Sequence, residues 1–268
     1  MKNKLIIIFW LIAFSFFFFS FSSFAQEKNF NQSYQDYLNS LNQYNQAHQN
    51  YLLAKKSYLN YKTLTSKTDA FNKTLEMLVL RNEVISNYLS TIRLKLKEIS
   101  GIINYKQNIL YLNLENEINW YNTHKELLAS TGSLEDLIAF SKQAETRYQE
   151  KTEILIYETL GNILISKEEK LKETINQTLR NLKAEIERIK EEKAKDTRLI
   201  ERWLLEVDNR LILANEKKSE AEKILEQINK SRDKFRDYSQ FQFILAQSHQ
   251  YLKEANFYLK EIIREIKK

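Results

Sequence analysis

The residues that most often carry out chemistry in proteins are few in this chain, and their spacing favours neither a catalytic nor a metal site. The three histidines, His48, His124 and His249, are far apart, and none has a second histidine at helical spacing. The chain has no cysteine, which excludes disulfides and thiolate metal ligands. We therefore predict no metal and no cofactor, and we expect each histidine to be a polar residue of a helix seam or of the surface.

The carboxylates and glycines give the same indication. Pairs such as Glu168-Glu169 and Glu191-Glu192 are adjacent in sequence, so they point to different sides of a helix and are expected to be solvated. Phosphate loops, dinucleotide fingerprints and nucleophile elbows all need clustered glycines. The chain has only three, about thirty residues apart: Gly101, Gly132 and Gly161. We predict that the protein is not an enzyme, because no nucleophile, base and orienting group can be assigned.

One aromatic pattern suggests an interaction surface. Tyrosines recur at intervals of seven: Tyr37, Tyr44, Tyr51 and Tyr58. A seven-residue interval returns to nearly the same side of a helix, so these side chains form a stripe. The stripe is either a helix seam whose phenol oxygens reach water or an aromatic strip that binds a ligand such as a glycan. We keep its four tyrosines as the candidate interaction residues.

The N-terminus has the three-part pattern of a secretory signal. Lys2 and Lys4 precede the uncharged apolar run 5–21, and small residues stand at Ser23 and Ala25. This pattern predicts a signal peptide over 1–25, cleaved after Ala25. The alternative is an uncleaved membrane anchor formed by 5–21, because about twenty apolar residues can span a bilayer. In both cases the positive N-terminus stays in the cytoplasm and the body becomes extracytoplasmic.

The charge of the chain does not point to nucleic acid. The formal net charge is +6, and removal of Lys2 and Lys4 with the signal lowers it to +4. The remaining excess is spread along the chain without a block of basic residues. We therefore expect no nucleic-acid partner.

The lack of helix-breaking residues determines the predicted fold. The chain has no proline and few glycines, so turns are rare and helices are long. We predict an all-α protein, an elongated antiparallel helical bundle or coiled-coil hairpin that follows the signal sequence. The expected helices are 29–64, 69–129, 134–230 and 240–266. The expected division is a signal segment 1–25, a Tyr/Asn/Gln-rich helix 26–66 and a long helical coiled-coil body 67–268.

Two apolar seams at heptad-like spacing support these helices. The second helix carries Leu75, Leu78, Ile85, Leu89, Ile92, Leu96, Ile99, Ile103 and Leu110, with Asn82 and Lys106 as polar interruptions. A seven-residue series begins in the third helix and continues past its expected end, with Lys193 as its only polar member: Leu179, Ile186, Ile200, Val207, Ala214, Ala221, Ile228 and Phe235. Because the Ser130–Ser133 turn reverses the chain, we expect the second helix to pair with the first part of the third.

Breaks are predicted at three places. Near residues 63–69, Ser66 and Asp69 have capping-box spacing. At Ser130–Ser133, a left-handed Gly132 ends one helix and Ser133 with Asp136 caps the next. A last break is expected within 229–239, whereas Gly101 is expected to lie inside the second helix.

Two functions remain from the sequence. The first is an exported, non-enzymatic helical scaffold or interaction protein of the cell envelope. Its partners would be envelope proteins, or other copies of this chain bound through coiled-coil seams. It would contact the membrane only through residues 5–21, and only if the signal segment is not cleaved. The alternative is an extracytoplasmic holdase chaperone with helical arms, because export, small size, basic charge and long helices are similar, in composition alone, to those of the Skp-type chaperones.

Overall fold

The computed structural model describes residues 29–99, 104–192 and 196–267. Within these ranges the chain is helical, without strands, which confirms the all-α prediction. The elements in chain order are α2 (Phe30–Tyr61), α3 (Leu64–Lys97), α4 (Asn104–Ala129), α5 (Leu134–Arg147), the π-helix η1 (Tyr148–Thr152), α6 (Glu153–Glu191), α7 (Arg198–Glu226), the 3₁₀ turn η2 (Ile228–Lys230) and α8 (Lys234–Ile266). The predicted signal segment 1–25 lies outside the described residues. Among the described residues, no helix has the length and apolar composition that a membrane span requires.

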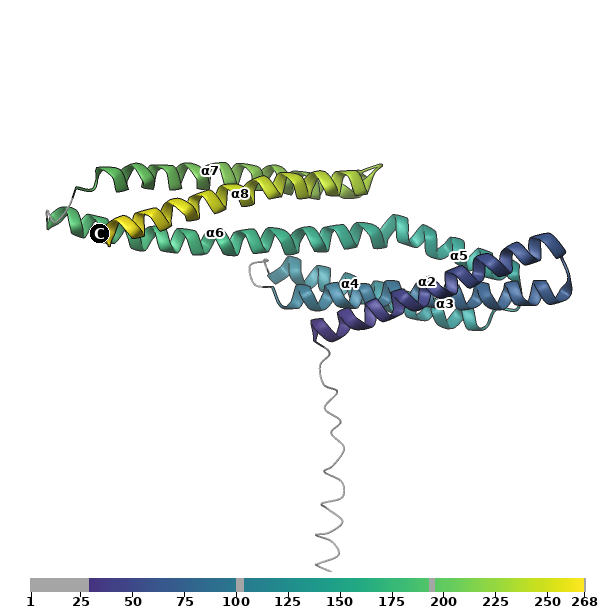
Figure 1. The fold of residues 1–268 in the computed structure, drawn as a ribbon. Helices are drawn as coiled ribbons and strands as arrows, with labels where there is room; N and C mark the ends of the chain where they lie inside the picture. Colours follow the sequence, from purple (N-terminus) through teal and green to yellow (C-terminus); the bar gives the residue numbers. More distant parts are fainter. Residues whose placement is uncertain (1–28, 100–103, 193–195, 268) are drawn as a thin grey trace, which may run out of the picture.

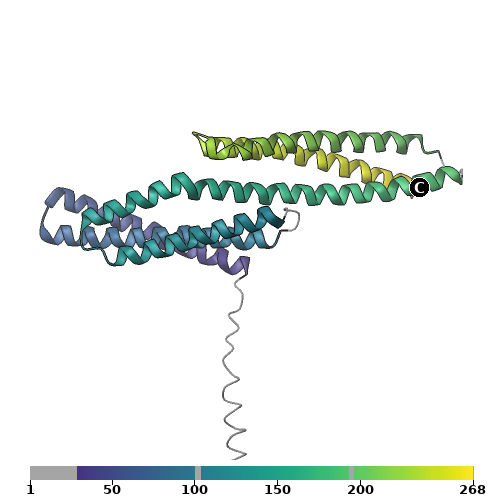
Figure 2. The same cartoon turned by 180° about the vertical axis from the view of Figure 1, so that it is seen from behind.

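One long rod joins two groups of helices (Figure 1). The rod consists of α5, η1 and α6, which follow each other without a break. The first bundle packs α2, α3 and α4 with α5 and the beginning of α6, and the second bundle packs α7 and α8 along the rest of α6. The view from behind shows the same arrangement (Figure 2). The rod spans Leu134–Glu191, which at 1.5 Å per residue corresponds to roughly 85 Å.

Small side chains let neighbouring helices approach closely in both bundles. The buried face of α2 carries a small residue at every seventh position: Ser33, Ser40, Ala47 and Ala54. The Ser33 hydroxyl lies 3.0 Å from that of Thr91 on α3, so the two polar groups satisfy each other. In the second bundle the Ser248 hydroxyl donates to the Ala214 carbonyl at 2.9 Å. These contacts explain why the tyrosines of α2 lie at the edges of the interface with α3 rather than at its centre.

The first turn forms where expected, but with different capping residues. Tyr61 ends α2, and Lys62 takes the left-handed conformation at φ 50°. Thr63 then caps α3: the Ser66 amide donates to its hydroxyl, and the Thr63 amide donates to the Ser66 hydroxyl. The predicted helix start at residue 69 is therefore wrong, because the Thr63 cap starts α3 at Leu64.

The predicted continuous helix 69–129 is also wrong. Lys97 ends α3, and α4 begins at Asn104 and runs back along α3, so residues 69–129 form two packed helices. Gly101, expected inside a helix, lies outside the described residues, as does Ile103. The Gln107 side chain donates to the Leu96 carbonyl at 2.8 Å and so satisfies a backbone acceptor at the end of α3. The expected pairing with the third helix is present only in part, because α3 packs mainly along α2 and α4.

The predicted helix 134–230 divides in the same way. Glu191 ends α6, and α7 begins at Arg198 and returns along the rod. The apolar residues of the predicted seam are buried, except for Phe235, which is 70% exposed. The prediction that Phe235 is buried is wrong, because this residue lies in the first turn of α8, after the chain has reversed direction again. That last break falls within 229–239 as predicted, although α8 begins at Lys234 rather than at 240.

The turn between α4 and α5 forms at the predicted residues without a left-handed glycine. The φ of Gly132 lies outside the left-handed region. Instead, the amides of Ser130 and Thr131 donate to the carbonyls three residues earlier and tighten the end of α4. The predicted cap of α5 is confirmed, because the Asp136 amide donates to the Ser133 hydroxyl at 3.1 Å.

Gly161 of α6 lies against the side chain of Leu225 of α7, and its substitution is expected to destabilise the fold. A Cβ at this position would lie 2.5 Å from Cδ2 and 3.1 Å from Cγ of Leu225, a core residue that is 4% exposed. We expect Gly161→Val to lower the free energy of unfolding by roughly 1–3 kcal/mol, as measured by urea denaturation. Gly132→Ala is the control and should be nearly neutral, because nothing lies within 4 Å of the added Cβ. Equal stability of the two variants would contradict the close contact.

Candidate functional site

The candidate site lies at the π-helix η1, where the rod passes from the first bundle to the second. A π turn widens a helix by one residue, and such turns occur frequently at functional sites. Its last residue, Thr152, is fully buried, and its hydroxyl donates to Glu117 Oε2 on α4 at 3.0 Å. The Tyr121 hydroxyl lies 3.0 Å from the same oxygen of Thr152. Because Thr152 has one proton and gives it to Glu117, Tyr121 must be the donor to Thr152.

An ion pair between a buried carboxylate and a half-buried arginine completes this polar network. Arg147, the residue before the π turn, donates from both Nε and Nη2 to the carboxylate of Glu117. The Nε to Oε2 distance is 3.1 Å, and Glu117 is only 6% exposed. The guanidinium also lies 5.1 Å above the ring of Trp120. The network holds the π turn against α4, and burial raises the pKa of Tyr121 to about 12, so that its phenol keeps the proton it donates.

On another side of the same turn, tyrosines line a cavity of about 350 Å³. Four tyrosines from four elements meet there: Tyr37 of α2, Tyr88 of α3, Tyr148 of η1 and Tyr157 of α6. The rings of Tyr37 and Tyr88 are 5.2 Å apart, and those of Tyr157 and Tyr238 of α8 are stacked at 4.6 Å. The tyrosine cavity thus joins α2, α3, η1 and α6, and Tyr157 connects it to Tyr238 of the second bundle.

Three phenols of the tyrosine cavity, those of Tyr88, Tyr148 and Tyr157, remain neutral at physiological pH. Burial raises the pKa of Tyr88 to about 12, and it also raises the pKa values of Tyr148 and Tyr157. One carboxylate, Glu153, also lines the cavity and lies 3.7 Å from Lys234 of α8. Aromatic faces, hydroxyl donors and one carboxylate are suited to binding a partner that is partly apolar and partly polar.

The structure divides the predicted tyrosine stripe. Tyr37 enters the tyrosine cavity, whereas Tyr44 and Tyr51 pack against the core around Leu78 with His48 between their rings. Tyr58 is half-buried near the end of α2. Sequence reasoning did not find Tyr88, Tyr148 or Tyr157, because they come from separate elements and share no spacing.

The three histidines occupy polar positions between or on helices, as expected. His124 Nδ1 lies 2.8 Å from the Asn82 amide nitrogen, so the predicted polar interruption of the seam has a buried partner. Burial lowers the pKa of His124. His249 Nδ1 lies 2.8 Å from Glu168, and His48 lies between two tyrosines. Within the described ranges no group of three or more His, Cys, Asp or Glu residues is placed to hold a metal ion.

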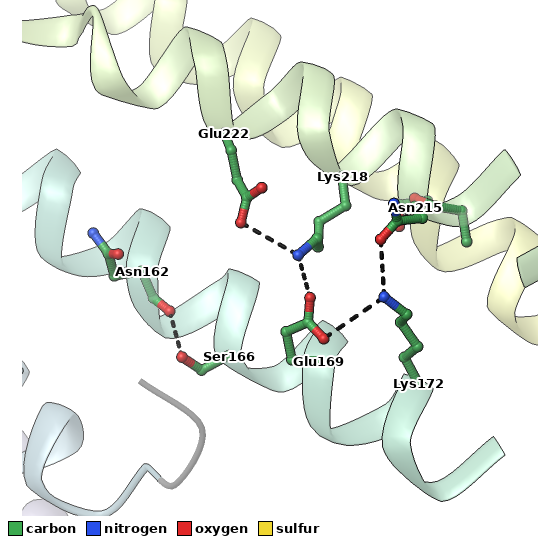
Figure 3. A network of polar contacts seen from close by, with 9 residues as sticks. Asn162, Ser166, Glu169, Lys172, Asn215, Lys218 and Glu222 are labelled. Atoms are coloured by element: carbon green, nitrogen blue, oxygen red, sulfur yellow. Dashed lines mark hydrogen bonds and ion pairs between the residues drawn. The ribbon is translucent and has the colours of Figure 1, made fainter. Parts of the chain in front are cut away.

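A second polar network separates α6 from α7 (Figure 3). Glu169 of α6 accepts from Lys218 of α7, which lies 3.4 Å from Glu222 on the same helix. Lys172 donates to Asn215 at 2.8 Å and lies 3.9 Å from Glu169. These residues bridge two helices that also share an apolar core, so we interpret the network as structural.

Comparison of the chain with protein-family models, with curated proteins and with solved structures found no match.

Proposed function

We propose that the protein is an exported, non-enzymatic helical scaffold or interaction protein of the cell envelope. The observation that carries this proposal is the rod of α5, η1 and α6, which connects two helical bundles. Such an arrangement is suited to placing two binding surfaces relative to each other. The antiparallel packing of helices on both parts of the rod supports an elongated helical bundle, and the residue pattern in 1–25 supports export.

The tyrosine cavity supports an interaction role at the centre of the rod. Its aromatic side chains are half-buried in the monomer, and Tyr148 remains 37% exposed at its rim. Tyrosine is enriched at protein interfaces because its ring buries apolar area while its hydroxyl finds a polar partner. We therefore propose that an envelope protein docks at this rim, and that Tyr37 is the member of the predicted stripe that takes part.

The alternative is an extracytoplasmic holdase. One observation favours it: large apolar side chains are exposed on both outer helices of the second bundle, among them Leu205, Phe243 and Phe257. Scattered exposed apolar side chains are also normal on soluble proteins, so this observation weighs less than the rod.

Affinity capture from the envelope of the native host, run beside an aggregation assay, tests the proposal. A scaffold should capture one or a few partners at reproducible stoichiometry, and it should not protect unrelated unfolded proteins from aggregation. Tyr148→Ala should reduce the capture at least tenfold with unchanged circular dichroism. The matched control, Tyr105→Ala, removes a 75% exposed tyrosine of α4 and should capture normally.

Two results would overturn the proposal. Broad protection of several unrelated clients would favour the holdase. Equal capture by the Tyr148→Ala variant and the control would show that the tyrosine cavity is not the docking site.

A further inference from the structure

The turn between α2 and α3 carries an exposed apolar surface. We call residues 52–68 the hairpin tip. Its large apolar side chains are strongly exposed: Leu52 43%, Leu53 68%, Leu59 59%, Tyr61 71% and Leu64 81%. This exposure follows from the inner face of the hairpin, which is closed by the small residues Ala54, Ser66 and Ala70 and leaves no room for these larger side chains.

The charge of the hairpin tip has one sign. Its four lysines are exposed: Lys55, Lys56, Lys62 and Lys67. No aspartate or glutamate occurs between Asp36 and Asp69 in the sequence. Within the part of the chain that the structure describes, the lysines of the hairpin tip form no ion pair, whereas Lys73, in the next turns of α3, pairs with Glu76 at 2.9 Å. The four charges are therefore available to an external anionic surface.

Apolar and basic side chains share one side of the hairpin tip. On α2, Lys55, Lys56 and Leu59 follow Leu52 by three, four and seven residues, so all four lie on neighbouring positions of the face opposite Ala54. Tyr58 and Tyr61 follow Ala54 by four and seven residues, so they lie on the Ala54 side of the helix, near its end. A helix face of leucines and lysines is typical of segments that lie in a membrane interface, where lysine stems extend toward the headgroups.

The hairpin tip also projects from the rest of the molecule. The turn between α2 and α3 lies beyond the turn that joins α4 and α5 (Figure 1, Figure 2). That second turn packs near Leu78, where Leu128 and Leu137 join the core. Leu78 is about 14 residues from Leu64, which corresponds to roughly 20 Å along α3. A convex projection of this length can reach a flat surface without obstruction by the bundle.

We propose that the hairpin tip binds anionic lipid surfaces, with its leucines inserted at the level of the headgroups and its lysines on the lipid phosphates. A second copy of the same tip is disfavoured as an occupant, because four unpaired positive charges would meet four others. Nucleic acid is disfavoured because it offers nothing apolar to the exposed leucines. This proposal does not depend on the proposed function, and it concerns a surface other than the apolar run 5–21.

Fluorescence from a label on the hairpin tip tests the proposal in the full chain. The chain has no cysteine, so Thr65→Cys gives one site for an environment-sensitive dye. With vesicles that contain about one third anionic phosphatidylglycerol, the emission should shift to the blue, and added salt should reverse the shift. Asn209→Cys on the exposed face of α7 is the matched control and should not respond, even if 5–21 binds the vesicle.

Two sets of substitutions separate the apolar and the electrostatic contributions. Leu59→Ser with Leu64→Ser should weaken tip binding at least tenfold. Lys55→Gln, Lys56→Gln and Lys67→Gln together should weaken it about a hundredfold, since each lysine near an anionic surface contributes a factor of about five. All five positions are exposed, so circular dichroism should remain unchanged.

Three outcomes would overturn the proposal. The first is the absence of a shift at position 65 with anionic vesicles. The second is an equal shift with vesicles of uncharged phosphatidylcholine. The third is a response of the dye to an acidic polypeptide but not to vesicles, which would make an acidic protein the occupant.

Discussion

Replacement of Leu89 by alanine is expected to lower the free energy of unfolding by roughly 2–4 kcal/mol, because it removes a fully buried side chain and leaves a cavity. Leu89 is 0% exposed and belongs to the core cluster that α3, α4 and α6 share, together with Leu96, Leu114 and Ile156. The measurement is urea denaturation followed by circular dichroism. The effect should appear without a change in the denaturant slope, since the substitution does not alter the surface exposed on unfolding.

Asn87→Ala, two residues away, is the matched control. Asn87 is half-buried, and its backbone carbonyl accepts a hydrogen bond from the Thr91 hydroxyl. The substitution leaves this backbone hydrogen bond in place. The variant should therefore be nearly neutral. Similar losses at both positions would mean that the buried face of α3 has been assigned wrongly.

The contrast between these two positions shows what the sequence could predict about the fold. The spacing of apolar residues identified the buried face of each helix, because an apolar face is buried regardless of which neighbouring helix packs against it. The local turn residues also predicted the ends near Tyr61, Ala129 and Ile228, where capping side chains lie within a few residues of the break.

The reversals between α3 and α4 and between α6 and α7 could not be predicted in the same way. An apolar seam with three-and-four spacing continues with little change when a helix folds back on itself, so Leu96 and Leu110 fit both a long helix and a hairpin. The group that satisfies the end of α3 is Gln107, a residue of the following helix. No local signal connects it with the carbonyl of Leu96.

The sequence pattern predicted only one residue of the candidate site. Tyr37 was selected because of its spacing with other tyrosines of α2, yet its neighbours in the tyrosine cavity come from α3, η1 and α6. The contacts that hold the π turn also join residues far apart in the sequence. Glu117 and Thr152 are 35 residues apart, and only the packing of α4 on the rod brings them within hydrogen-bonding distance.

The largest loss of stability is expected from Arg147→Met. The substitution leaves the carboxylate of Glu117, which is 6% exposed, without its cation in the interior. Breaking a buried pair by removing one partner typically costs about 3–5 kcal/mol, because the remaining buried charge loses the cation that compensates it. The hydroxyl of Thr152 still donates to Glu117, but one neutral donor does not replace a guanidinium that binds both carboxylate oxygens.

Two further variants separate the lost pair from the lost packing of Arg147. Adding Glu117→Gln to Arg147→Met should restore part of the stability, because no charge is then buried alone. Arg188→Met removes an arginine that also contacts two glutamates, Glu185 and Glu192, but on the surface of α6, and it should be nearly neutral. If the double variant were no more stable than Arg147→Met alone, the loss would come from packing against Trp120 rather than from the unpaired carboxylate.

The position of this pair also predicts where the structure should loosen. Arg147 and Thr152 are at the two ends of the π turn, and both hold it against Glu117 of α4. In Arg147→Met, hydrogen exchange should therefore accelerate first in the amides around Tyr148–Thr152, while those of α7 and α8 remain protected. Uniform acceleration along the whole chain would instead mean that the two bundles unfold as one unit and that the π turn is not a local joint of the rod.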